Sequence, residues 1–182
     1  MNRCSWVNMK NPLYVKYHDE EWGVPTHKDK ALYELLILES FQAGLSWECV
    51  LNKRENFRKA FDNFDIDKVS NYDETKINEL LQNTGIIRNK LKINASINNS
   101  KIFKEIQKEF GSFDKYIWGF TNGEIVIESF YKRTFSPLSD KISKDLKKRG
   151  MNFIGTTIIY SYLQAIGIIN GHSENCYKFK SN

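Results

Sequence analysis

A glutamate lies on the apolar face of a predicted helix in the first quarter of the chain. In KDKALYELLILES, residues 28–40, Leu32, Leu35 and Leu36 repeat at helical spacing, and Glu39 follows seven residues after Leu32 on the same stripe. A carboxylate buried without a partner costs several kcal/mol, unless it is paired or has a use. We therefore predict that Glu39 either has a buried ion-pair partner or performs a chemical function.

Aromatic residues are concentrated near this carboxylate in the sequence. Trp6, Tyr14, Tyr17 and Trp22 fall within the first two dozen residues, and Trp47 follows Glu39 by eight positions. Such clusters pack a protein core in most cases, and that interpretation stays open here. Aromatic faces beside a buried carboxylate also suit a flipped purine, which stacks on the rings while its exocyclic amine donates to the carboxylate. A cationic base would bind such faces more strongly than a neutral one.

Cysteine and histidine residues near the two ends of the chain form a second candidate site. Cys4 and His18 lie near the start, and His172 and Cys176 are four residues apart in HSENC. Thiolates and imidazoles are the ligands that zinc prefers, and a site with four protein ligands would be structural, with no open position for water. The spacing alone does not match a standard zinc finger, so scattered, unrelated residues remain an alternative.

A rival interpretation is enzymatic and also involves zinc. The segment from His18 to Glu20 forms H-x-E, the first half of the zinc nucleobase deaminase signature. The second half, P-C-x-x-C, is absent from the chain, which argues against a deaminase.

The segment ELLQNTGIIRNKLKI could bind nucleic acid. It predicts two helices joined by a turn at Gly85, with Ile86 and Ile87 packing between them and Arg88 and Lys90 at the start of the second helix. A helix N-terminus with free N–H groups and added positive charge suits a phosphate. No acidic residue occurs from Leu80 to Lys104, and the pattern therefore favours a helix-hairpin-helix DNA-binding element over an ordinary helical hairpin.

Most of the remaining chain also has helical periodicity, so we predict an all-α fold. Helices are expected over residues 28–42, 46–61, 74–84, 88–110, 112–120, 137–149 and 156–165, with a short capped turn over 65–70. Asp65, Asp73 and Ser136 are the expected N-caps of three of these segments. The stretch TNGEIVIESFYKRTF is predicted to be a loop or an irregular excursion.

The length, composition and net charge are those of an ordinary globular protein. The 182 residues suit one domain, 41% of them are hydrophobic, and the net charge is +5. No stretch is apolar enough to predict a membrane span, and MNRCSWVNMK lacks the apolar core of a signal peptide, so a cytoplasmic location is expected. Three cysteines make an odd count, which argues against a disulfide framework.

Several long blocks together resemble the bacterial 3-methyladenine DNA glycosylase I family. They are RCSWV, PLYVKYHDEEWGVP, LESFQAGLSW, VLNKREN, TGIIRNKLKI, LKKRGMNFIGTTIIYSYLQAIGIING and HSENC, which cover nearly the whole chain. The resemblance implies one glycosylase domain over residues 1–182, with a two-lobed helix-hairpin-helix fold. The hairpin would lie near residues 73–93, and the N- and C-terminal segments would form the smaller lobe.

The resemblance also implies the residues of the site. The base would be bound by Trp6, Tyr14, Tyr17, Trp22, Glu39 and Trp47, with Glu39 and Tyr17 as the catalytic pair. Leu45 would fill the gap left by the extruded nucleotide, and Gly85, Ile86, Arg88 and Lys90 would contact DNA. One structural zinc ion per chain would be bound by Cys4, His18, His172 and Cys176.

The implied reaction is the hydrolysis of the N-glycosidic bond of 3-methyladenine in double-stranded DNA. Methylation at N3 leaves the purine cationic, so its departure needs no strong general acid. The absence of acidic residues from Leu80 to Lys104 agrees with a family that lacks the catalytic aspartate of other helix-hairpin-helix glycosylases. A monomer is expected. Two alternatives remain open: a non-catalytic nucleic-acid-binding module, and the zinc deaminase.

Overall fold

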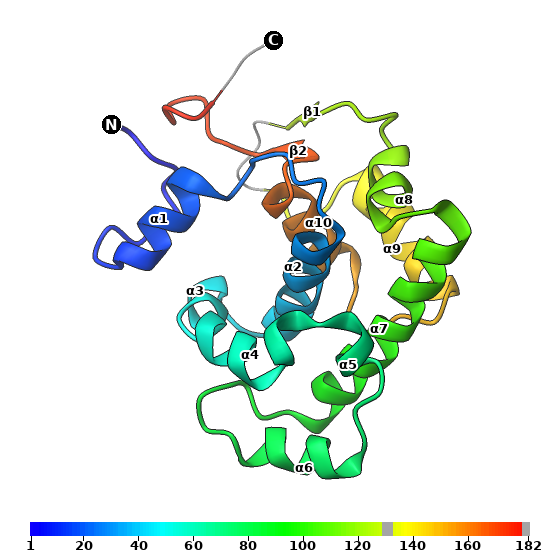
Figure 1. Cartoon of the computed structure of the whole chain (residues 1–182). Helices are drawn as coiled ribbons and strands as arrows, with labels where there is room; N and C mark the ends of the chain where they lie inside the picture. Colours follow the sequence, from blue (N-terminus) through cyan, green and yellow to red (C-terminus); the bar gives the residue numbers. More distant parts are fainter. Residues whose placement is uncertain (129–132, 180–182) are drawn as a thin grey trace.

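The computed structural model describes residues 1–128 and 133–179, and these are mostly helical (Figure 1). The helices are α1 (Pro12–Glu20), α2 (Asp29–Gln42), α3 (Trp47–Leu51), α4 (Arg54–Ala60), η1 (Asp62–Phe64), α5 (Ile66–Val69), α6 (Glu74–Gln82), α7 (Lys90–Phe110), α8 (Phe113–Gly119), α9 (Pro137–Lys148) and α10 (Thr156–Ala165). The strands are β1 (Val126–Ile127) and β2 (Ile169–Asn170). No described helix combines the length and the apolar content needed to cross a bilayer.

Helix α2 is the centre of the fold, and it packs against α3, α7, α8 and α10. Every residue from Leu32 to Phe41 is buried, so this helix is covered around its whole circumference rather than on one stripe. Two acids, Glu34 and Glu39, are therefore buried on it. Lys92 of α7 reaches the end of α2, where its Nζ donates to the carbonyl groups of Phe41 (2.9 Å) and Ala43 (2.5 Å).

Most predicted helix starts are confirmed, because their caps depend on local sequence. The side chains of Ser46, Asp65, Asp73 and Ser136 each accept a backbone N–H in the first turn of the helix that follows. The predicted helix over 88–110 begins two residues later, at Lys90, with Asn89 as its N-cap. Arg88 therefore lies in the turn and not in the helix.

The helices differ from the sequence-based expectation in two places. The single helix expected over 46–61 is two helices, because the chain turns at Asn52 and Lys53, where the Lys53 N–H bonds the Val50 carbonyl in place of a carbonyl four residues back. The N-terminal aromatic segment, for which no helix was predicted, contains α1, with Asn11 as cap and Pro12 in its first turn. The predicted all-α class is confirmed as a mostly helical fold, to which β1 and β2 add a short parallel pair.

The two strands join segments that are distant in sequence. Val126 pairs with Ile169, and Ile127 with Asn170. β1 lies in the stretch TNGEIVIESFYKRTF, of which residues 129–132 are outside the described part of the chain. Figure 1 shows β2 leading from α10 to the C-terminal segment, which lies at the same end of the molecule as the N-terminus.

Candidate functional site

A cavity of about 160 Å³ lies among α1, α2, α3 and α10. The residues that line it are Trp6, Tyr14, Tyr17, Trp22, Glu39, Gln42, Trp47, Ser161 and Gln164. All six residues predicted to bind a base are among them. The volume is several times the roughly 30 Å³ share of one liquid water molecule, so the cavity is larger than an ordinary packing void.

Helical spacing explains how three of the elements contribute to this wall. α1 provides Tyr14 and Tyr17, α2 provides Glu39 and Gln42, and α10 provides Ser161 and Gln164, each pair three residues apart. Residues at this spacing lie on one face of a helix, so each helix presents two side chains to the cavity. The other contributors lie just outside or at the start of helices: Trp6 before α1, Trp22 after it, and Trp47 as the first residue of α3.

The two buried acids of α2 have different surroundings. The Glu34 carboxylate accepts from Arg54 Nε at 2.6 Å and pairs with Arg58 NH2 at 2.7 Å. Glu39 is 2% exposed, has no basic partner among the described residues and faces the cavity. Burial raises the pKa of Glu39 well above its usual range, because the charged form loses its hydration in this environment. Glu34 is thus an ion-paired acid, whereas Glu39 is not.

Three buried polar atoms in the cavity wall have no hydrogen-bond partner within the described chain. They are the Glu39 Oε2, the Gln42 Oε1 and the Trp47 Nε1. The first two accept hydrogen bonds and the third only donates. Because buried polar groups in native proteins are nearly always paired, three orphan atoms around one cavity indicate a site for a polar ligand.

The aromatic side chains surround the cavity at mutual angles. The rings of Trp6 and Tyr14 are 5.3 Å apart at 51°, those of Trp6 and Trp22 are 4.8 Å apart at 71°, and those of Tyr17 and Trp47 are 5.3 Å apart at 43°. Burial, followed by the nearby Glu39, raises the pKa of Tyr17 well above its ordinary value. The Tyr17 hydroxyl therefore stays protonated at neutral pH and remains a potential donor.

Gln42, Ser161 and Gln164 are the lining residues that the sequence analysis missed. Gln42 could have been found, because it follows Glu39 by one helical turn. Ser161 and Gln164 are polar interruptions of the apolar segment IGTTIIYSYLQAIGII, which is a weaker signal. Only the packing of α10 against α2 places them in the same wall as Glu39.

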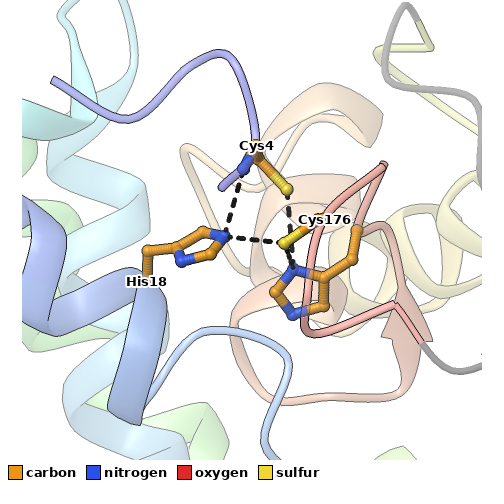
Figure 2. Close-up of side chains that lie close together, drawn as sticks. Cys4, His18 and Cys176 are labelled. Atoms are coloured by element: carbon orange, nitrogen blue, oxygen red, sulfur yellow. Dashed lines mark hydrogen bonds between the residues drawn. The ribbon is translucent and has the colours of Figure 1, made fainter. Parts of the chain in front are cut away.

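The four predicted metal ligands are buried and lie together. Their ligand atoms are all within 4.8 Å of one another. The Cys176 Sγ is 3.4 Å from the His18 Nε2 and 3.5 Å from the His172 Nδ1, which is also 3.5 Å from the Cys4 Sγ. Figure 2 shows Cys4, His18 and Cys176 converging from the N-terminal segment, α1 and the C-terminal segment.

This donor set fits a four-coordinate zinc ion. Ideal tetrahedral Zn–S and Zn–N bonds place a sulfur and a nitrogen ligand about 3.5 Å apart, close to the separations found here. Burial lowers the pKa of His172 to about 4 and lowers that of His18, so both imidazoles are neutral and able to bind a metal. Burial also raises the pKa of the Cys4 thiol, so its thiolate form requires a nearby cation.

The predicted DNA-contacting residues lie on two exposed turns. The hairpin between α6 and α7 contains Gly85, whose N–H donates to the Asn83 Oδ1 at 2.9 Å, and the buried Ile86. Arg88 and Lys90 are exposed, and Lys90 has only a long 3.9 Å contact with Glu74. Arg88 makes no hydrogen bond or ion pair to the described residues.

The second turn consists of residues 43–46, between α2 and α3. It contains Leu45, whose side chain is 42% exposed. Lys92, from the acid-free run, is buried and holds the start of this turn through the Ala43 carbonyl. Lys104, at the end of the same run, pairs with Asp67 at 2.5 Å. The run is therefore not one continuous basic surface: two of its exposed basic residues, Arg88 and Lys90, lie at the hairpin, and Lys101 lies farther along α7.

Comparison with known proteins gives a consistent result. The family model described as methyladenine glycosylase matches residues 6–179. The chain is 42% identical over its full length to DNA-3-methyladenine glycosylase 1 of Escherichia coli (strain K12), covering 99% of that protein. Its fold matches a crystal structure of a 3-methyladenine DNA glycosylase I with a TM-score of 0.94, at 43% identity over 98% of this chain and all of the other.

A further solved relative is a phenylalanine-for-tyrosine variant of a 3-methyladenine DNA glycosylase I in complex with 3-methyladenine. It has a TM-score of 0.93 and 34% identity, with each chain covered completely. The match of the family model to nearly all of the sequence, together with these relatives, shows that the chain belongs to the methyladenine glycosylase family.

Proposed function

We propose that this protein is a base-excision repair enzyme that flips 3-methyladenine out of double-stranded DNA and hydrolyses its N-glycosidic bond without cutting the strand. The observation that carries the proposal is the cavity in which aromatic rings surround the unpartnered atoms of Glu39, Gln42 and Trp47. A relative of the same fold is bound to 3-methyladenine, which supports this class of ligand.

The chemistry of the lesion complements the cavity. N3-methylation gives the purine a positive charge, and its exocyclic amine is a hydrogen-bond donor. The base would stack on the aromatic wall while the amine donates to Glu39, whose buried carboxylate has no other partner. The positive charge of the base offsets the cost of ionising Glu39, so the acid and the lesion stabilise each other.

Bond cleavage in this cavity needs little acid catalysis. When the C1′–N9 bond breaks, its electron pair moves to the base and neutralises the positive charge, so no proton must be supplied to the leaving group. A water molecule then adds to C1′ and loses a proton. Glu39 favours the positive charge that develops on the sugar, and the neutral Tyr17 hydroxyl donates a hydrogen bond in the cavity.

The hairpin and the turn 43–46 would contact the DNA. Arg88 and Lys90 provide exposed positive charge for phosphates, and the turn carries Leu45 to fill the space of the extruded nucleotide. Lys92 bonds the carbonyl groups at the end of α2, so the base cavity and this turn are held in one arrangement. The proposal includes a two-lobed helix-hairpin-helix domain that acts as a monomer.

One zinc ion per chain would be bound by Cys4, His18, His172 and Cys176. All four positions of a tetrahedral ion are taken by protein atoms, so the metal would be structural and would not activate water. This arrangement distinguishes the proposal from a zinc deaminase, which requires an open coordination position.

The test is an incubation of the protein with methylated double-stranded DNA, followed by chromatography of the released bases. Free 3-methyladenine and intact abasic strands are the expected products. DNA binding without any released base would indicate a non-catalytic binding module, and a deaminated base within intact DNA would indicate the deaminase. Either of these results would overturn the proposal.

A further inference from the structure

The two histidines of the candidate metal centre also contact the aromatic wall of the base cavity. The His18 ring lies 5.4 Å from the Trp6 ring, and the His172 ring lies 4.5 Å from the Trp22 ring. His18 also stacks on Trp22 at 6.2 Å and 19°. Both tryptophans line the cavity, so they are shared by the metal centre and the cavity.

A carboxylate holds His18 from the side opposite the sulfur ligands. The His18 Nδ1 donates to the Asp19 Oδ1 at 2.8 Å, because a carboxylate only accepts. This bond leaves the Nε2 lone pair directed at the metal centre, 3.4 Å from the Cys176 Sγ. Asp19 is itself fixed by Arg3, whose Nε and NH2 donate to it at 2.8 and 2.6 Å.

The turn at Trp22 and Gly23 packs against the second histidine. The His172 ring lies edge-on to the Trp22 ring at 84°, and it also lies directly against Gly23. A Cβ atom on Gly23 would lie 2.8 Å from the His172 Nε2, and its φ of +77° also favours glycine. The Gly23 N–H donates to the Gln164 carbonyl, which ties this turn to α10, another helix that lines the cavity. The position of His172 and that of the Trp22 ring therefore depend on each other.

We propose that metal binding at this centre and base binding in the cavity are thermodynamically coupled through Trp6 and Trp22, and that Asp19 is the positioning residue that orients His18 for both. The inference rests on the proposed zinc site and base site, and adds a link between them. Coupling is reciprocal: if the metal orders the wall that the base binds, then the bound base must also retain the metal.

The first experiment measures the zinc affinity of the intact protein by equilibrium competition with a coloured chelator, with and without saturating free 3-methyladenine. Zinc affinity at least threefold higher with the base is the expected result. Equal zinc affinities, in protein that contains zinc and binds the base, would overturn the coupling alone. Protein that lacks zinc or does not bind the base would overturn the proposed sites and the coupling together.

The second experiment uses Asp19→Asn, with Asp145→Asn as the matched control. Asp145 accepts from Tyr116 and Arg149 in a comparable cluster that contains none of the metal ligands. Asp19→Asn should release zinc at least threefold faster and bind 3-methyladenine more weakly at limiting zinc, with affinity restored by excess zinc. The control should match the parent in both measurements. If added zinc does not change the affinity of Asp19→Asn for 3-methyladenine, the positioning role is contradicted. This holds whether that affinity equals the parent's or is lower.

Discussion

At the scale of single residues, Glu39 is a buried acid whose environment is unfavourable in the absence of a ligand. It shares α2 with Glu34, which has two arginine partners, yet Glu39 has a buried oxygen without any partner in the described chain. A protein gains nothing in stability from such a group. A bound cationic ligand would offset the free-energy cost of burying this carboxylate.

Replacing Glu39 with Gln should raise the stability of the ligand-free protein while reducing base release. The folded state holds the Glu39 proton more tightly than the unfolded state, because its pKa is raised. Stability therefore falls as pH rises from the unfolded pKa toward the higher folded one, and Glu39→Gln removes this loss. At neutral pH we therefore expect Glu39→Gln to unfold at a higher urea concentration than the parent protein.

The measurements are urea unfolding from pH 4 upward and release of 3-methyladenine from alkylated DNA. Release should fall at least tenfold, while binding to undamaged DNA stays intact. Glu34→Gln is the informative contrast, because it breaks an ion pair and should destabilise the protein. Unchanged base release by Glu39→Gln would remove Glu39 from the mechanism.

Trp47 can contribute to base binding through its aromatic face and through its indole N–H. Trp47→Ala removes the stacking surface and should weaken binding of free 3-methyladenine by about 1–3 kcal/mol. Trp47→Phe keeps an aromatic face but removes the unpartnered N–H, and should cost about 0.5–1.5 kcal/mol. Titration calorimetry would measure both. The control is Trp118→Phe, since the Trp118 indole donates to the Thr26 carbonyl outside the cavity; equal affinities for all four proteins would make Trp47 a core residue.

At the scale of elements, helical spacing forms most of the cavity wall. α1, α2 and α10 each place two lining residues three positions apart on one face. The helices themselves follow from local caps and apolar patterns, whereas their mutual arrangement follows from the burial of α2 by its neighbours. The hairpin between α6 and α7 is separate from this wall and carries two exposed basic residues, Arg88 and Lys90.

Removing the exposed charge of the hairpin should weaken DNA binding without affecting the base cavity. Arg88→Ala should lower the affinity for DNA of any sequence. It should also reduce the slope of log binding constant against log salt concentration by about one, as expected for one lost phosphate contact. Affinity for free 3-methyladenine should stay the same. Fluorescence anisotropy at several salt concentrations measures the slope. Lys101→Ala is the matched control, because Lys101 is an exposed basic residue of α7 far along the helix from the hairpin. If Arg88→Ala binds DNA with the parent slope, then the hairpin is not a phosphate contact.

At the scale of the whole molecule, the four predicted metal ligands bring the two ends of the chain together. Cys4 and His18 come from the first elements, and His172 and Cys176 from the segment after β2. The Tyr177 N–H also donates to the Asn2 carbonyl at 2.9 Å, so the terminal segments lie side by side. The Arg3 guanidinium and the His18 ring also lie near the Tyr177 ring, so these contacts and the predicted ligands together connect the two segments.

Removing the metal should therefore destabilise the protein. We expect a strong chelator to lower the midpoint of thermal unfolding by at least about 5 °C, which corresponds to roughly 1–2 kcal/mol for a chain of this size. Differential scanning calorimetry gives the midpoint, and elemental analysis gives the zinc bound per chain. The variant Cys4→Ser/Cys176→Ser should already have the lower midpoint and should not respond to the chelator. A parent protein that holds zinc but keeps its midpoint after chelation would show that the centre does not stabilise the fold.

The sequence by itself determined the local features of this protein. Caps and periodicity predicted most helices, because a cap bonds N–H groups only two or three residues away. A carboxylate among leucines marked Glu39, and the length of the matching blocks indicated the family. The break at Asn52, the start of α7 and the β1–β2 pair were not predicted, since the first two depend on one or two hydrogen bonds and the third joins residues more than 40 positions apart.

Only the tertiary structure decided which distant side chains meet. It brought Ser161 and Gln164 to the wall of the same cavity as Glu39, buried Lys92 against the end of α2, and placed Trp6 and Trp22 between the cavity and the predicted metal ligands. These contacts join residues separated by up to about 150 positions, and no local pattern specifies them. They arise because α2 is mostly apolar and is buried on every side, so the neighbours that cover it determine which polar groups face the cavity.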